Sequence, residues 1–161
     1  MLQGDPAAWL AQFKPLEERL SRTIDEVWPI CIGPLKSIKN TMTHEDHITN
    51  HLVKALIKSK KVPGRLIPQY PILTEKVDKT IHLSSQIDFV LTIGDDENVY
   101  LACECKRLNV PFKSGLKGLV GEYIDDGLMR FITGQYANGL PLAMMLGYVM
   151  NAHVDRARKG L

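Results

Sequence analysis

Two stretches of the chain, SQIDFVLTI at residues 85–93 and VYLACECK at residues 99–106, decide the predicted fold. Each is a short, mostly apolar run of the kind found in buried β-strands. The residues between them, GDDEN at 94–98, form an acidic turn. The three segments together predict a β-hairpin.

Alternation along these two strands determines which polar side chains can meet. Successive strand residues point to opposite faces, so Glu104 and Lys106 share one face and the two neighbouring cysteines point away from it. Asp88 faces opposite to the apolar residues around it, which are Ile87, Phe89 and Leu91. Hairpin pairing therefore brings Asp88 close to Glu104. Adjacent carboxylates repel unless a cation lies between them, and oxygen ligands of this kind suit Mg²⁺ or Mn²⁺.

Helical periodicity surrounds this hairpin. An Asp5–Pro6 cap starts a first helix that Pro15 kinks or splits and that Pro29, Gly33 and Pro34 end. A second helix begins at Thr43, with Thr43 and Asp46 as a capping pair, and runs to about Lys61. A third helix covers about Leu119 to Tyr136 and ends at Asn138–Gly139.

The remaining segments complete an α/β fold. Short strand-like runs are expected at Leu66–Ile67 and Tyr70–Leu73, a loop at Arg107–Gly118, and a strand buried on both faces at Leu140–Met150. These elements predict a central mixed sheet flanked by helices. We expect a single domain over residues 1–161, with an N-terminal helical extension (1–40), a core (43–150) and a polar C-terminal tail (151–161).

A third acid is predicted to approach the hairpin. At about 100° per residue, Glu45 falls within the arc of the second helix that carries Ile48, Leu52 and Leu56. This arc is the face turned to the core. A carboxylate in the first turn of such a face needs a partner, and a metal bound at the sheet would supply one.

These residues resemble a known family. Asp88 followed by Glu104-Cys105-Lys106 after an acidic turn resembles the D…(D/E)-x-K signature of the PD-(D/E)xK nuclease superfamily, which has the restriction-endonuclease-like fold. Glu45 on a preceding helix, and the helix and strand that follow, match the α-β-β-β-α-β core of that superfamily. Ile87 stands where the family usually has proline.

The resemblance implies a function. Asp88, Glu104, Glu45 and the backbone carbonyl of Cys105 would bind Mg²⁺, for which Mn²⁺ could substitute. Lys106 would act on an attacking water activated by the metal. The product ends would be a 5′-phosphate and a 3′-hydroxyl, and the substrate would be DNA, although RNA stays open. Many members dimerise, so a homodimer or a larger complex is expected, and analogy with the family suggests a setting in prokaryotic defence or mobile elements.

Basic residues near these motifs are candidates for phosphate contacts. The residues expected to bind nucleic acid are Lys58, Lys61, Arg107, Lys113, Lys117 and Arg130. Most belong to two basic runs that no acid interrupts, one at the end of the second helix and one after Glu104. Arg130, on the third helix, has an alternative role as the partner of a nearby carboxylate.

Three other motifs are less specific signals: the histidines of the second helix, the loop at 113–118 and the Gln135–Tyr136 pair. His44, His47 and His51 could bind zinc with Cys103 and Cys105, but the strand alternation turns the thiols away, and solvated or groove-lining histidines are preferred. The loop KSGLKG at 113–118 lacks Walker spacing and is interpreted as a flexible loop that contacts the nucleic-acid backbone. Gln135 and Tyr136 are adjacent on the third helix, whereas some superfamily members space a Gln and a Tyr four apart.

Composition limits the function classes. With 20 Lys and Arg against 18 Asp and Glu, a net charge of +2 excludes a protein that holds nucleic acid by bulk charge alone. Three cysteines cannot close a disulfide framework, which favours a reducing cytoplasm. No apolar stretch approaches a membrane span, and the first residues lack the features of a signal peptide. We therefore expect a cytoplasmic protein without a membrane partner.

Three alternatives to a nuclease stay open. Asp88, Lys106 and Glu104 could form only an ionic cluster at the end of the sheet, which would leave Glu45 without a counterion. The chain could be a catalytically inactive nuclease-like subunit for nucleic-acid binding or assembly. It could also be a small structural subunit that meets a partner through an apolar helix face.

Overall fold

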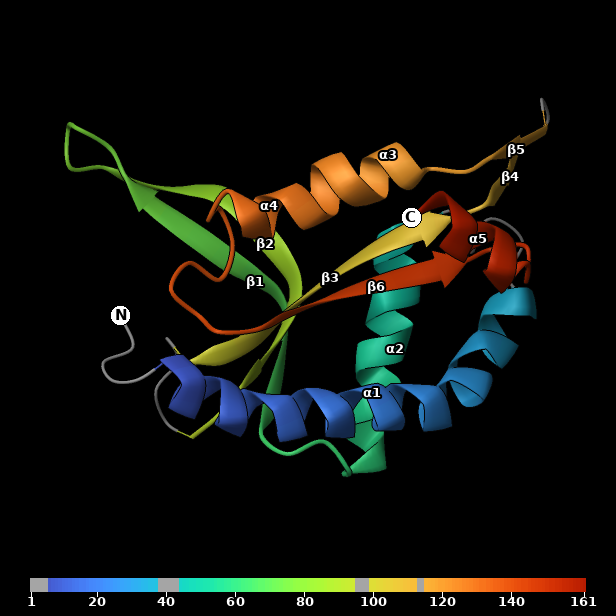
Figure 1. Ribbon diagram of the computed structural model, residues 1–161, viewed down its shortest axis with the longest axis horizontal. Coiled ribbons are helices and arrows are strands. Elements are labelled where there is room, and N and C mark those ends of the chain that lie inside the picture. Colours follow the sequence, from blue (N-terminus) through green and yellow to red (C-terminus); the bar gives the residue numbers. More distant parts are fainter. Residues whose placement is uncertain (1–5, 38–43, 95–98, 113–114) are drawn as a thin grey trace.

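The computed structural model describes residues 6–37, 44–94, 99–112 and 115–161, arranged as helices around a four-stranded sheet (Figure 1). In chain order the elements are α1 (Pro6–Ser37), α2 (Glu45–Ser59), β1 (Arg65–Glu75), β2 (Ile81–Thr92), β3 (Tyr100–Leu108), β4 (Val110–Phe112), β5 (Gly115–Lys117), α3 (Val120–Tyr123), a π-helical turn (Ile124–Leu128), α4 (Met129–Ile132), β6 (Ala143–Val149) and α5 (Val154–Gly160). The predicted caps Asp5 and Thr43 lie outside the described residues.

The four-stranded sheet has the order β1-β2-β3-β6. β1 and β3 are both antiparallel to β2, whereas β6 is parallel to β3, so the sheet is mixed, as predicted. The predicted hairpin and a final strand are both present. The expectation that the final strand is buried on both faces is wrong, because β6 lies at the edge of the sheet and only Met144 and Tyr148 in it are buried. The β2–β3 ladder is short and runs only from Thr92↔Tyr100 to Phe89↔Cys103. Asp88 and Glu104 are therefore the first residues beyond the paired part of the hairpin.

Helices cover the two faces of the sheet differently. Phe13 and Leu20 of α1 and Leu52 of α2 belong to one buried cluster with Phe89 and Cys103 of the sheet. The predicted N-terminal extension thus shares this core. On the opposite face, a second cluster joins sheet residues to the segment that follows α4; its buried members are Ile87, Val90, Ala102 and Tyr136.

The strand alternation predicted around Asp88 holds only in part. Phe89 and Leu91 lie in the cluster under α1 and α2, but Ile87 lies in the second cluster together with Val90. On the N-terminal side of Phe89, β2 no longer pairs with β3 and pairs with β1 alone. We attribute the altered orientation of Ile87 to the stronger twist of a two-stranded ribbon.

The predicted end of the first helix is wrong. α1 continues through Pro15, Pro29, Gly33 and Pro34 to Ser37. Each proline removes one helical hydrogen bond and costs about 3 kcal/mol in an isolated helix. The buried stripe of α1 offsets this cost, because tertiary packing supplies most helical stability in proteins; its members are Phe13, Leu20, Val27 and Cys31.

The predicted third helix is shorter and less regular than expected. It consists of α3, the π-helical turn and α4, and it ends at Ile132 rather than at Tyr136. Gly134 has φ +73° and provides the left-handed residue that ends a helix, five positions before the expected Gly139. The expectation that Gln135 and Tyr136 are helical is therefore wrong.

Smaller differences occur at the edges of the sheet. The two strand-like runs near residue 70 form one edge strand, β1, in which Pro68 and Pro71 are tolerated because an edge strand need not donate every amide. The predicted loop 107–118 contains the short hairpin of β4 and β5. The polar tail contains α5. No described helix combines the length and apolarity needed to cross a membrane.

Candidate metal and phosphodiester site

Asp88 closes the gap where β2 and β3 separate. Its Oδ2 accepts a hydrogen bond from the backbone amide of Cys105 at 2.6 Å. Asp88 lies next to the last pair of the β2–β3 ladder, Phe89↔Cys103. At this position the side-chain carboxylate, in place of a backbone carbonyl of β2, accepts the amide of β3. Asp88 is thereby fixed beside Glu104.

Glu104 is the most deeply buried acid of the site, with 1% of its surface exposed. Its Oε1 accepts hydrogen bonds from Lys106 Nζ at 3.0 Å and from Arg130 Nη1 at 3.3 Å. Its Oε2 is buried and has no hydrogen-bond partner. A buried carboxylate oxygen without a partner is costly, so Oε2 is the acceptor in this site that a ligand would satisfy.

Lys106 connects Glu104 to the first turn of α2. Its Nζ donates to Glu45 Oε1 at 3.1 Å and to the carbonyl of Cys105 at 3.0 Å. The other oxygen of Glu45, Oε2, accepts the backbone amide of Arg107 at 2.9 Å. The protein partners of Glu45 are thus a lysine and a backbone amide, and its predicted role as a metal ligand stays a prediction. The Cys105 carbonyl, a predicted metal ligand, contacts the same ammonium group.

Arg130 reaches the site from α4 and is held by Tyr136. Its Nη1 lies 2.6 Å from the Tyr136 hydroxyl, which in turn donates to the carbonyl of Gln86 at 2.6 Å. The guanidinium carbon also lies 5.4 Å from the centre of the Tyr136 ring. Arg130 pairs with a carboxylate, that of Glu104, as the second of its two predicted roles requires. Its contact with a phosphate stays a prediction.

The role of Tyr136 was missed by sequence reasoning. Tyr136 is 1% exposed and lies six residues after Arg130, a spacing that does not place two residues on one face of a continuous helix. The contact exists because the helix ends at Ile132 and Gly134 turns the chain back toward the sheet. The available signal was Gly134, which could have been interpreted as the helix end.

Burial and neighbouring charges shift the pKa values of Asp88, Glu104 and Lys106. Burial raises the pKa of Asp88 from 3.8 to about 7, and the nearby charge of Glu104 adds to this effect. Burial likewise raises the pKa of Glu104, although Lys106 and Arg130 oppose the shift. Burial alone would lower the pKa of Lys106, but the carboxylates of Glu104 and Glu45 outweigh it and hold the pKa above its usual value.

The donor set fits a hard divalent cation. Asp88 and Glu104 offer carboxylate oxygens, and Glu104 Oε2 is buried without a partner. Burial and the neighbouring Glu104 raise the pKa of Asp88, and a cation bound beside the pair would oppose that shift. Within the part of the chain that is described, however, no group of three or more His, Cys, Asp and Glu is arranged to hold a metal ion. Any such cation would therefore rely on Asp88 and Glu104, with water completing its shell.

The zinc alternative receives no support from this geometry. Cys103 and Cys105 are fully buried in the cluster under α1 and α2, on the side of β3 away from Glu104. Burial raises the pKa of both thiols, which opposes the thiolate form that zinc requires. The described residues contain no His and Cys group with metal-site geometry.

The two predicted phosphate-binding residues at the end of α2 lie away from the acids. Lys58 is 13 residues beyond Glu45 on α2, a separation of about 20 Å along the helix. Lys61 follows it and pairs with Glu26 of α1 at 2.7 Å. The basic run at the end of α2 therefore does not flank the site, because the length of the helix separates the two.

The other predicted contacts are distributed differently. Arg107 joins the site through its backbone amide, and Arg130 joins it through its side chain. Lys117 is exposed on β5. Lys113 lies outside the described residues.

Comparisons with known proteins add no relative. The chain matches no protein-family model, no curated protein and no solved structure.

Proposed function

We propose that the chain is a Mg²⁺-dependent nuclease with a restriction-endonuclease-like core. The observation that carries the proposal is the convergence of Asp88, Glu104, Lys106 and Glu45, taken from three elements, into one group of contacts between 2.6 and 3.1 Å. These are the four side chains that the D…(D/E)-x-K resemblance assigns to catalysis.

The order of elements supports the same proposal. Leaving aside the small β4–β5 hairpin, the chain from α2 to β6 follows the order α-β-β-β-α-β. The final strand lies parallel to β3, which carries Glu104 and Lys106, and the sheet is mixed. Asp88 and Glu104 lie directly beyond the last pair of the β2–β3 ladder, Phe89↔Cys103.

The proposed roles follow from the contacts. Asp88 and Glu104 would hold the cation, and Glu104 Oε2 is the oxygen free to do so. Mg²⁺ bound there would polarise a phosphate oxygen and make an attacking water more acidic. Lys106 would place its ammonium group beside that water, and Glu45 would orient Lys106. Arg130, 31% exposed at its side chain, would offer its outer nitrogens to a phosphate.

Substrate and location are part of the proposal. DNA is the proposed substrate, cut by water to leave a 5′-phosphate and a 3′-hydroxyl, as the resemblance implies. A reducing cytoplasm is supported by the free thiols of Cys31, Cys103 and Cys105, all of which are buried.

The test is metal-dependent nicking of supercoiled plasmid by the purified chain. We expect nicking with Mg²⁺ or Mn²⁺, none in EDTA, and at least a hundredfold loss in the Asp88→Asn and Lys106→Ala variants. The matched control is Asp125→Asn, because Asp125 is an exposed acid on the π-helical turn. Nicking that survives Asp88→Asn, or that persists in EDTA, would contradict the proposal.

One observation favours the inactive-subunit alternative. Lys106 already contacts three acceptors, and with Arg130 it neutralises Glu104 without any metal. A purely ionic cluster would look the same at these atoms. Calorimetric titration with Mn²⁺ separates the two functions, since the nuclease requires heat of binding that Asp88→Asn removes, whereas the inactive subunit shows DNA binding alone.

A further inference from the structure

The β1–β2 hairpin extends well beyond the region in which β2 also pairs with β3. β1 pairs with β2 from Arg65↔Thr92 to Glu75↔Ile81, whereas β3 pairs only with the last four residues of β2, 89–92. The first part of β2 is therefore bonded to β1 alone. In Figure 1 the turn between β1 and β2 stands clear of the rest of the ribbon. We call residues 73–83 the arm.

One face of the arm is exposed and mostly apolar, with Glu75 as its charged member. Leu73 lies opposite Leu83, and Glu75 lies opposite Ile81, so the period of two places these four residues on the same face. The exposed fractions are 61% for Leu73, 69% for Ile81 and 52% for Leu83, and Val77 in the turn is fully exposed. Large apolar side chains gathered in this way mark a surface that contacts another molecule.

The arm is an ordered structure. Lys76 and Thr80 close the turn with a backbone bond of 2.8 Å. Asp78 Oδ1 accepts from both the amide and the hydroxyl of Thr80, at 3.0 and 2.6 Å. A two-stranded ribbon with a bare apolar face is only marginally stable in water. The arm therefore gains stability when this face is covered.

Charge restricts what can cover it. The arm carries two acids, Glu75 and Asp78, and two lysines, Lys76 and Lys79, so its formal charge is zero. Lys79 also pairs with Glu75 at 3.0 Å. Nucleic acid and anionic membranes attract surfaces with an excess of Lys and Arg, which the arm lacks. A second copy of the arm has no net charge and offers the same exposed apolar side chains, so the two faces can cover each other without net charge repulsion.

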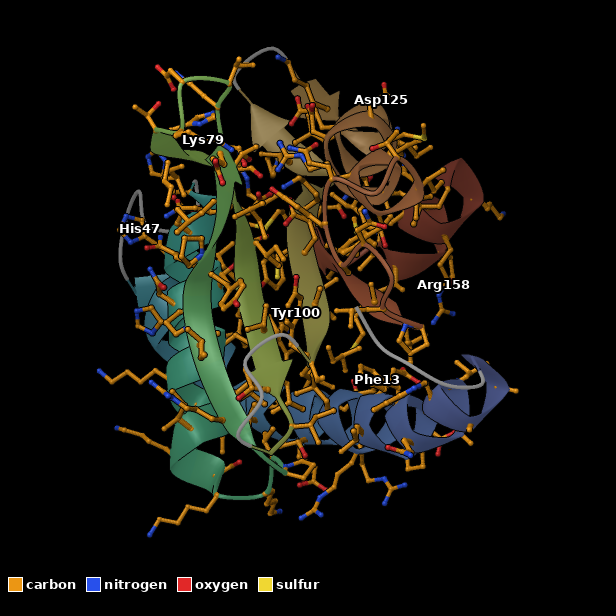
Figure 2. All side chains as sticks on the ribbon, turned by 90° about the vertical axis from the view of Figure 1, so that its left-hand side faces the viewer. Phe13, His47, Lys79, Tyr100, Asp125 and Arg158 are labelled. Atoms are coloured by element: carbon orange, nitrogen blue, oxygen red, sulfur yellow. The ribbon has the colours of Figure 1, made fainter. Side chains whose placement is uncertain are left out.

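We propose that the arm is the contact between two copies of this chain, with the apolar faces packed about a two-fold axis. Pro68 and Pro71 restrict further strand pairing along the part of β1 nearest the body, whereas no proline interrupts the edge from Ile72 to Glu75. Figure 2 shows Lys79 of the arm at the end of the molecule away from Phe13 of α1, so the bodies of two copies can stay apart. The inference does not depend on the proposed nuclease activity.

The surface area that the arm can bury limits the expected affinity of the dimer. A standard stable interface buries roughly 800 Å² on each partner, and a two-stranded arm offers less. The dimer is therefore expected to dissociate on dilution, and its detection needs a series of concentrations.

The test is light scattering after size exclusion on the purified full chain. We expect a mass that rises toward twice 18.1 kDa with concentration. The Ile81→Lys and Ile81→Glu variants should each stay at 18.1 kDa, and an equal mixture of them should dimerise again, because opposite charges then meet at the axis. Val77→Lys, in the turn, should weaken the dimer at least tenfold without disturbing a strand.

The matched control is Ile30→Glu. Ile30 is 74% exposed on α1, close to the 69% of Ile81, and it lines a groove of about 420 Å³ between α1 and α2. The proposal predicts that Ile30→Glu dimerises like the wild type. A wild type that stays at 18.1 kDa at every concentration, a dimer insensitive to both Val77→Lys and the Ile81 variants, or a dimer lost only in Ile30→Glu would overturn it.

Discussion

The ammonium nitrogen of Lys106 lies 3.1 Å from Oε1 of Glu45, a residue 61 positions earlier in the chain. The same nitrogen lies 3.0 Å from Oε1 of Glu104. One cation therefore joins the first turn of α2 to the centre of β3. Without Lys106, the carboxylates of Glu45 and Glu104 would lie beside Asp88 with Arg130 as their remaining counterion.

Replacing Lys106 with methionine should destabilise the fold. Removing one member of a buried ion pair leaves an uncompensated charge and costs about 3–5 kcal/mol. The loss should be largest near pH 7 and should shrink toward pH 4, because burial raises the pKa of Glu104 and its carboxylate takes up a proton as the pH falls. Urea unfolding at both pH values measures it. Lys61→Met is the control, because its pair with Glu26 is exposed and is worth less than about 1 kcal/mol; equal losses in the two variants would contradict the prediction.

Asp88→Asn should stabilise the metal-free protein at alkaline pH. The pKa of Asp88 is about 7 in the fold and 3.8 without its environment, so the folded protein holds an extra proton between these values. Wild-type stability therefore falls as pH rises from about 4 to about 7, by up to about 4 kcal/mol. The variant has no such group. Thermal unfolding in EDTA should show its advantage growing across this window and levelling above it.

The exposed acid Asp125 provides the control for this pH effect. Asp125→Asn should follow the wild-type curve, since no charge is buried there. A constant difference between Asp88→Asn and wild type from pH 4 to pH 8 would show that Asp88 does not titrate in this window.

The acids of the site could be foreseen because they depend on local periodicity. The period of two along the hairpin placed Glu104 and Lys106 on one face, and the period of 3.6 placed Glu45 on the inner side of α2. The structure finds all three in mutual contact through Lys106. Such short repeats are fixed by backbone geometry and need no knowledge of distant segments.

The missed features depend on contacts between distant segments. Pro15 and Pro29 are helix breakers locally, yet α1 continues through them because its buried stripe packs on the sheet. The Arg130–Tyr136 contact requires the chain to turn at Gly134. The distance of Lys58 from the acids follows from which end of α2 meets β3. Of these features, only the turn at Gly134 had a local signal, the glycine itself.

Tyr136→Phe should weaken the positioning of Arg130. The change removes the hydroxyl that accepts from Arg130 and donates to the Gln86 carbonyl, both at 2.6 Å. We expect a stability loss of about 1 kcal/mol and, if the chain is a nuclease, a lower kcat with little change in KM. In the Arg130→Ala background the same change should leave kcat unaltered, because no guanidinium then needs positioning. Additive effects of the two changes would contradict the role.

Gly127→Ala should disturb the site through Met145 and Lys106. Gly127 is buried on the π-helical turn, and a Cβ there would lie 2.5 Å from Met145 Cε and 3.5 Å from Lys106 Cγ. Because the Met145 side chain can move, the stability loss should be modest, about 1–2 kcal/mol. Adding Met145→Ala should recover part of it by removing the clash. Gly121→Ala is the control, since its nearest neighbour is 3.9 Å away, and it should be neutral or stabilising by up to about 1 kcal/mol. A Gly127→Ala variant as stable as Gly121→Ala would mean that α3 and α4 can shift away from β3 and β6 without cost.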